Sequence, residues 1–243
     1  MAKLKTIVSA LSSPKRLLRG LKYTVNDDAY WDNYVRKWQK DKSNESLRYL
    51  GNEWKNEEKF LELLAKYSLP AGTALEIGCG GGRITSRAAG CFGRIHACDI
   101  SAEMLKLSAA SVKDSHVSFH RLDGFTLKDF ADASMDRVYS HDVFVHFSSL
   151  QVYPYFEEIK RVLKPGGIGL VSFYNFVAHF KLFKEMSLQL RSERRFPPHM
   201  RVHFITEEMV RTMLDDLGLE VIEIDKANFL IAVFRKKSAT GGG

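Results

Sequence analysis

The residues best suited to chemistry in this chain are two acids on either side of a glycine-rich turn. Glu76 lies in an apolar stretch that ends at Ile77, and glycines follow at alternate positions, Gly78, Gly80 and Gly82. Glycine has no Cβ, so such a turn tolerates positive φ angles and lets a ligand approach the main chain closely. Asp99 ends the next apolar stretch about 20 residues later, the spacing of ribose-binding acids in nucleotide-binding βαβ units. The pattern therefore predicts a site for a cofactor that contains adenosine.

The glycine spacing narrows the choice of cofactor. A dinucleotide fingerprint, G-x-G-x-x-G/A, would require glycine or alanine where Arg83 stands, and no G-x-x-x-x-G-K-[ST] phosphate loop is present. The order acid-x-Gly-x-Gly-x-Gly over residues 76–82 instead resembles the first motif of the class I S-adenosylmethionine-dependent methyltransferases. S-Adenosylmethionine carries no phosphate. A loop that binds it therefore has to let the cofactor come close to the main chain, and does not have to bind an anion.

The resemblance covers residues 53–236 through four further segments that occur in the family's order: 99–105, 122–124, 136–147 and 159–167. It implies an α/β fold with a doubly wound, mostly parallel seven-stranded sheet, Rossmann-like, and an antiparallel final strand. It also implies S-adenosyl-L-methionine as the cofactor.

The same resemblance assigns cofactor-binding residues. Glu76 and the glycines would shape the site for methionine and ribose, Asp99 would accept the ribose hydroxyls, and Asp123 would accept the adenine amino group. The full set is Glu76, Gly78, Cys79, Gly80, Gly82, Asp99, Ile100, Met104, Asp123, Gly124 and Ser140. For Cys79 the simpler interpretation is a small residue that fits the turn.

Methyl transfer to a hydroxyl also needs a group that takes up the proton, and histidine titrates near neutral pH. His146 follows the fourth expected strand, whose carboxyl end faces the ligand crevice in such sheets. A histidine often stands at this place in the O-methyltransferases of the family. His146 is therefore the candidate general base and His141 the second choice, the alternative being that His146 only lines the pocket. More distant candidates are His179, His199 and His203, and no cluster of carboxylates and histidines indicates a metal site.

Composition favours a cytoplasmic globular protein. The 243 residues are 45% hydrophobic, enough for one core with appendages, and no run of 18 apolar residues predicts a membrane span. The N-terminus lacks the pattern of a secretory signal. The three cysteines show no metal spacing, which favours reduced thiols. The net charge of +7 fits nucleic acid, an anionic membrane or a phosphorylated substrate, and also a protein that binds none of these.

Three regions are expected along the chain. Residues 1–52 form an N-terminal helical extension, 53–236 the methyltransferase domain, and 237–243 a disordered tail. Residues 1–22 are basic and amphipathic, which fits peripheral contact with a membrane or partner, or a helix packed on the domain. Tyr30, Tyr34 and Trp38 share one helical face that either caps the cofactor cleft or packs inward.

Within the domain, short apolar strands alternate with helices, which predicts a parallel sheet. Strands are expected near 73–77, 93–98, 117–121, 136–140 and 167–173, and helices near 53–67, 82–90, 101–112 and 149–163. Thr206 is the expected N-cap of a further helix that ends near Gly218, and residues 219–224 and 229–234 form a closing hairpin.

An insertion at about 175–205 is expected to form a basic and aromatic lid over the acceptor side of the cleft. Such a lid suits an anionic, partly apolar or sugar-like acceptor, and the alternative is a solvated helix packed by its aromatic face.

No Asn-Pro-Pro-Tyr-like motif follows the fourth expected strand, which favours an oxygen acceptor over a base amino group. The sequence thus predicts O-methylation of a small molecule or a saccharide, and the saccharide could be attached to a lipid or phosphate carrier. The enzyme is expected to be cytoplasmic, with peripheral contact with the inner membrane surface. Three alternatives stay open: an RNA or protein methyltransferase, a non-catalytic protein that binds S-adenosylmethionine, and a nicotinamide oxidoreductase, which Arg83 disfavours.

Overall fold

The computed structural model describes residues 28–41, 57–193 and 202–238. The expectations for residues 1–22, for the tail beyond 238 and for His199 lie outside this part of the chain. The strands are β1 (Leu69–Ile77), β2 (Phe92–Asp99), β3 (Val117–Arg121), β4 (Met135–Ser140), β5 (Leu163–Asn175), β6 (Phe204–Ile205), β7 (Leu219–Asp225) and β8 (Phe229–Lys236). The α-helices are α3 (Asp28–Asp41), α4 (Glu58–Lys66), α5 (Arg83–Ala88), α6 (Ala102–Ser111), α7 (Ser149–Val162), α8 (Phe180–Glu193) and α9 (Glu207–Asp216). Two single turns of 3-10 helix are η2 (Ala89–Cys91) and η3 (Phe144–His146).

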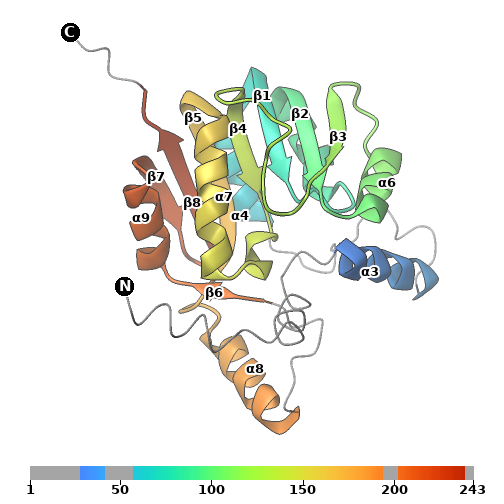
Figure 1. Ribbon diagram of the computed structural model, residues 1–243, viewed down its shortest axis with the longest axis vertical. Coiled ribbons are helices and arrows are strands. Elements are labelled where there is room, and N and C mark those ends of the chain that lie inside the picture. The colour runs from blue at the N-terminus through green and yellow to red at the C-terminus, as the bar shows by residue number, and fades with distance from the viewer. Residues whose placement is uncertain (1–27, 42–56, 194–201, 239–243) are drawn as a thin grey trace, which may run out of the picture.

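One twisted sheet organises the described residues, in the order β3-β2-β1-β4-β5-β8-β7 (Figure 1). The strands from β3 to β5 in this order pair in parallel, and β8 is antiparallel to both β5 and β7. The expected fold class is confirmed, including the antiparallel final strand. The two-residue strand β6, which pairs in parallel with β5, is an addition, because two residues are too few to show any periodicity.

Helices cover both faces of the sheet, and each face has its own core. On one face, Phe156 and Ile159 of α7 and Leu214 of α9 pack against the strands. On the other, Phe60 of α4 and Ile84 of α5 do the same. Strands buried on both faces explain the nearly continuous apolar runs of the sequence.

Helix α3 stands outside these layers and packs on α6 (Figure 1). Its inward residues are Trp31, Tyr34, Val35 and Trp38, of which Val35 and Trp38 form a small core with Met104. The expected inward face of Tyr30, Tyr34 and Trp38 is therefore only partly confirmed. The packed set follows the spacing i, i+3, i+4, i+7, which centres the buried face on Val35 and Trp38 and leaves Tyr30 at its border.

The carboxyl ends of the parallel strands lie at one edge of the sheet, so the turns after β1, β2, β3 and β4 meet there. At this edge α3 comes close to the turns, and here the functional site is found.

Candidate cofactor and catalytic site

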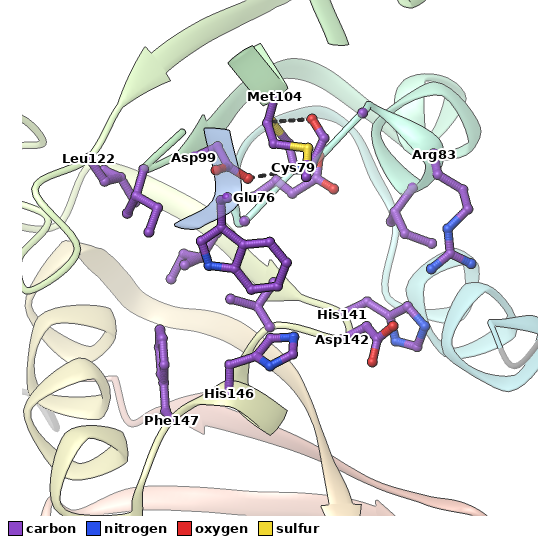
Figure 2. Close-up of a pocket in the computed structure, with 18 of the residues that line it drawn as sticks. Glu76, Cys79, Arg83, Asp99, Met104, Leu122, His141, Asp142, His146 and Phe147 are labelled. Carbon is purple, nitrogen blue, oxygen red and sulfur yellow. Dashed lines mark hydrogen bonds between the residues drawn. The ribbon is translucent and has the colours of Figure 1, made fainter. Parts of the chain in front are cut away.

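A cavity at the carboxyl edge is lined by the turns after four strands, by α3 and by α7 (Figure 2). Nine of the sequence-predicted residues border it: Glu76, Gly78, Cys79, Gly80, Asp99, Ile100, Met104, His141 and His146. Gly82, Asp123, Gly124 and Ser140 are not among the lining residues, and their part in cofactor binding stays a prediction. The sheet thus gathers at one place residues that are 70 positions apart in the sequence.

The glycine turn has positive φ angles, which favour glycine, at Gly78, Gly80 and Gly82. Gly78 has φ +76°, and a Cβ built on it would lie 2.2 Å from Cγ2 of Val143. Gly80 has φ +52° but open space around it, since no atom lies within 4 Å of a built Cβ. At Gly78 the turn therefore needs glycine for packing, whereas at Gly80 it leaves the main chain open to a ligand.

The two acids of the motif are buried beside this turn. Glu76 is 2% exposed, and its Oε2 accepts hydrogen bonds from Thr85 Oγ1 at 2.6 Å and from the Tyr139 hydroxyl at 3.2 Å. Burial raises the pKa of Glu76 to about 7, although these hydrogen bonds oppose the shift. Burial therefore makes the protonated form of Glu76 easier to populate than that of an exposed glutamate.

Asp99 fastens the glycine turn to the end of β2. Its Oδ2 accepts the Gly80 N–H at 2.9 Å, and its Oδ1 accepts the Ser101 N–H at 2.9 Å. Burial raises the pKa of Asp99 to about 6, against the effect of these bonds. A carboxylate offers two oxygens with two acceptor sites each, so Asp99 keeps acceptor capacity for a ligand beside these bonds.

Helix α3 closes the cavity opposite the turn, and Trp31 and Tyr34 are its lining residues. The helix is tied to α6 by Asp32, whose Oδ1 accepts the Ser101 hydroxyl at 2.6 Å and the Glu103 N–H at 3.3 Å. The sequence-level alternative in which this aromatic segment borders the cofactor cleft is the arrangement observed, with Trp31 rather than Tyr30 in contact.

Asp123 lies after β3, and its carboxylate accepts hydrogen bonds from the loop that follows it. Oδ1 accepts the N–H groups of Phe125 and Thr126, both at 2.8 Å, and Oδ2 accepts the Thr126 hydroxyl at 2.7 Å. Burial alone would raise the pKa of Asp123, but these bonds lower it to about 2. The neighbouring Leu122 supplies the lining of the cavity at this point.

The two histidine candidates differ in their surroundings. His146, in η3, lines the cavity, and its ring centroid is 4.9 Å from that of Trp31. His141 is 6% exposed, packs on Phe60, and has Nδ1 at 3.1 Å from Ser172 Oγ. Burial, followed by the charge of Arg83, lowers the pKa of His141 to about 3. His141 is therefore a weak base at neutral pH, and His146 is the better placed of the two.

The remaining predicted residues have structural partners. The Ser140 hydroxyl donates to the Ile77 carbonyl at 2.8 Å, and His179 Nδ1 lies 3.2 Å from the Asn175 carbonyl. Burial raises the pKa of the Cys79 thiol well above its ordinary value, so it is a poor nucleophile. In the described ranges, no group of three or more histidines, cysteines or acids is arranged to hold a metal ion.

Two lining residues that sequence reasoning missed are Arg83 and Asp142 (Figure 2). Arg83 is 7% exposed and pairs with the buried Glu57, which also bonds Arg87. Asp142 has φ +61°, a conformation that costs energy for a residue other than glycine, and Ser172 Oγ accepts its N–H at 2.9 Å. The Asp142 Oδ1 atom is buried without a hydrogen-bond partner among the described residues.

Burial raises the pKa of Asp142 to about 7, and the nearby Arg83 acts in the opposite direction. A buried carboxyl oxygen without a donor, in the field of a nearby arginine, is the kind of site that a ligand completes. The sequence signal for Arg83 was its place directly after the glycine turn, whereas nothing in the sequence marks the positive φ of Asp142.

Comparisons with known proteins agree with this geometry. A family profile described as a methyltransferase domain matches residues 75–171, which span β1 to β5. A methyltransferase of Methanosarcina mazei, described as S-adenosylmethionine-dependent, is 18% identical and superposes with a TM-score of 0.60, covering 73% of this chain and 98% of that one.

Magnesium protoporphyrin IX methyltransferase from Synechocystis, solved with bound S-adenosylhomocysteine, is 16% identical with a TM-score of 0.66 and covers 86% of this chain and 98% of its own. The [4+2]-cyclase SpnF is also similar, at 16% identity and a TM-score of 0.58, covering 74% of this chain and 81% of its own. Since these identities are low, the structural likeness establishes the fold, and a cyclase on the same fold shows that the reaction has to be argued from the site.

Proposed function

We propose that this chain, which belongs to the class I S-adenosylmethionine-dependent methyltransferases, transfers the methyl group to an oxygen of a small molecule or a saccharide, with His146 as the general base. The observation that carries this proposal is the position of His146, whose ring borders the same cavity as Asp99 and the glycine turn. The cofactor of the chain is S-adenosylmethionine.

The lining residues fit the adenosine part of this cofactor. The open main chain at Gly80 leaves room for close approach, and the Asp99 carboxylate retains acceptor capacity for the ribose hydroxyls. Met104 and Leu122 provide apolar contacts of the kind that a purine ring requires.

At the other end of the cavity, Arg83 and Asp142 suit the amino-acid part of the cofactor. A zwitterion carries one carboxylate and one ammonium group, and the guanidinium donors of Arg83 match the first. The unpartnered Oδ1 of Asp142 matches the second. When the cofactor is bound, its sulfonium supplies the leaving-group drive for an in-line displacement.

The role of His146 follows from the demands of that displacement on an acceptor hydroxyl. As the oxygen gains the methyl group it must lose its proton, and a neutral imidazole within reach takes it up. The ring contact with Trp31 restricts the orientation of His146. His141 is less suited, because its lowered pKa makes proton uptake unfavourable near pH 7.

Features near the acceptor side favour a small substrate. The lining next to His146 includes the aromatic residues Trp31, Phe147 and Tyr155, which offer flat apolar surfaces to a ring such as a sugar or an aromatic alcohol. We further propose a cytoplasmic protein in peripheral contact with the inner membrane surface, and a lipid- or phosphate-linked acceptor is consistent with this. No described helix is both long and apolar enough to cross a membrane.

The test is transfer of labelled methyl groups from S-adenosylmethionine into a cell extract, followed by separation into small-molecule, saccharide, lipid, RNA and protein fractions. Label in the first three fractions that is lost with His146→Ala supports the proposal. Label confined to RNA or protein would overturn it, and so would intact cofactor binding without label in any fraction.

A further inference from the structure

Helix α8 carries an exposed surface that the methyltransferase reaction does not explain. The helix projects from the carboxyl edge of the sheet, beyond β6 (Figure 1). Phe180 is 51% exposed and Leu188 54%, and Val177 in the preceding turn is 76% exposed. Large apolar side chains in such positions mark interaction sites when they are contiguous.

Phe180 and Leu188 lie on the same side of α8 because of helical spacing. Phe180, Lys184, Leu188 and Arg191 follow one another at intervals of three and four, so they form one exposed stripe along the helix. Lys181 lies beside this α8 stripe on the exposed surface, and Glu185 borders it. Among the described residues, none of the three cations has an acid within ion-pair distance. The stripe therefore presents apolar side chains together with an excess of positive charge.

The opposite side of α8 is anchored to the domain, so the stripe has a fixed direction. Met186 is buried, and the Phe183 ring contacts those of Phe176 at 5.0 Å and Phe204 at 5.6 Å. Phe204 belongs to β6, which pairs with the end of β5. The helix is thus held against the sheet edge by an aromatic cluster, while its stripe faces outward.

The other exposed apolar residues also lie at the carboxyl edge of the sheet. In the described part of the chain, the large hydrophobic side chains that are exposed are Phe125, Leu150, Val177, Phe180, Phe183, Leu188 and Met209. Each belongs to a segment that leaves the carboxyl end of β3, β4, β5 or β6. The cofactor cavity is lined at the same edge by the segments that follow β1, β2, β3 and β4. One edge of the molecule therefore combines the cavity with its exposed apolar residues.

We propose that α8 is a docking surface for an anionic lipid bilayer, with Phe180 and Leu188 inserted among the lipids and Lys181, Lys184 and Arg191 placed at the headgroups. Aromatic and aliphatic anchors next to Lys and Arg are what binding in the plane of an anionic membrane interface requires. Docking in this way directs the cavity edge toward the bilayer, where an acceptor carried by a lipid would be met. The proposal concerns binding and does not depend on the acceptor suggested above.

The experiment is flotation of the full-length protein with vesicles of phosphatidylcholine, with and without phosphatidylglycerol. The test variant is Lys181→Glu/Lys184→Glu, and the matched control is Arg94→Glu/Lys113→Glu, which makes the same charge change at the opposite edge of the sheet. Each basic residue near the surface contributes appreciably to binding, so the test variant should lose at least about 10-fold in affinity for the anionic vesicles. The control should stay within about 2-fold of the unmodified protein, whatever the N-terminal segment contributes.

A second variant, Phe180→Ser/Leu188→Ser, tests the apolar part of the α8 stripe and should also weaken binding to the anionic vesicles. S-Adenosylmethionine binding, measured on every variant, should be unchanged, which shows that the fold is kept and separates this proposal from the catalytic one. Equal losses for the test and control charge variants would overturn the proposal. So would absence of vesicle binding by the unmodified protein, or RNA binding that the α8 variants abolish while vesicle binding is kept.

Discussion

Replacement of Asp99 by alanine separates the cofactor-binding role of this residue from its role in the fold. Two buried N–H groups, those of Gly80 and Ser101, would lose their acceptor, at about 1–3 kcal/mol each. Against this, the rise of the Asp99 pKa from 3.8 to about 6 means that keeping the carboxylate charged at neutral pH costs about 3 kcal/mol, which the substitution removes. The net loss of unfolding free energy should therefore stay below about 3 kcal/mol.

The affinity for the cofactor gains nothing from Asp99→Ala that would offset the lost hydrogen bonds. Loss of the charged hydrogen bonds to the ribose should weaken binding of S-adenosylhomocysteine by about 1–3 kcal/mol, roughly 5- to 150-fold. Isothermal titration calorimetry measures the affinity, and denaturant unfolding measures the stability. The affinity of Asp99→Asn should lie between those of the unmodified protein and Asp99→Ala. Asp114→Ala, at an exposed position, is the control and should leave the affinity unchanged. An Asp99→Ala protein that is folded and binds with unchanged affinity would refute the assignment.

Three further predictions concern the same site. His146→Ala should lower turnover by about 10²–10⁴-fold and leave S-adenosylhomocysteine affinity unchanged; an unaltered rate at saturating acceptor would exclude His146 as the base. Burial raises the pKa of Glu76 from 4.5 to about 7, so the folded state holds a proton that the unfolded state has lost, and this contribution to stability declines as the pH rises through that window. Glu76→Gln should flatten the decline in denaturant unfolding measured between about pH 5 and 7, whereas an identical slope would contradict the pKa. Gly78→Ala should destabilise the fold by more than about 2 kcal/mol, because of its positive φ and its overlap with Val143, whereas Gly80→Ala should chiefly weaken cofactor binding. Equal stabilities of the two glycine variants in thermal unfolding would argue against this distinction.

The order of strands and helices could be predicted from the sequence because its signals are local. Apolar stretches such as the one ending at Ile77 are bounded by glycine or proline turns, and parallel pairing follows from their alternation with helices. Caps are equally local, since Thr206 accepts the Met209 N–H and Gly218 has φ +67°, as expected for the two ends of α9.

The details of the site depend on contacts between distant segments, which the sequence does not show. The buried face of α3 was shifted by one residue toward Trp31, because its position is decided by packing on α6. Asp123 appears in the sequence as a ligand acid, yet its oxygens are used by the loop that follows it. Asp142 cannot be identified from the sequence, because a positive φ at a residue other than glycine leaves no mark in it.

The most direct test of O-methyl transfer is to identify the atom that receives the methyl group. The product formed from methyl-labelled S-adenosylmethionine is isolated from the extract fraction that takes up the label, and nuclear magnetic resonance distinguishes methyl on oxygen from methyl on nitrogen or carbon. A methyl group on oxygen, formed by the unmodified protein and lost with His146→Ala, is the result we expect. A methyl group on nitrogen or carbon, or one that forms equally well without His146, would contradict the proposed reaction.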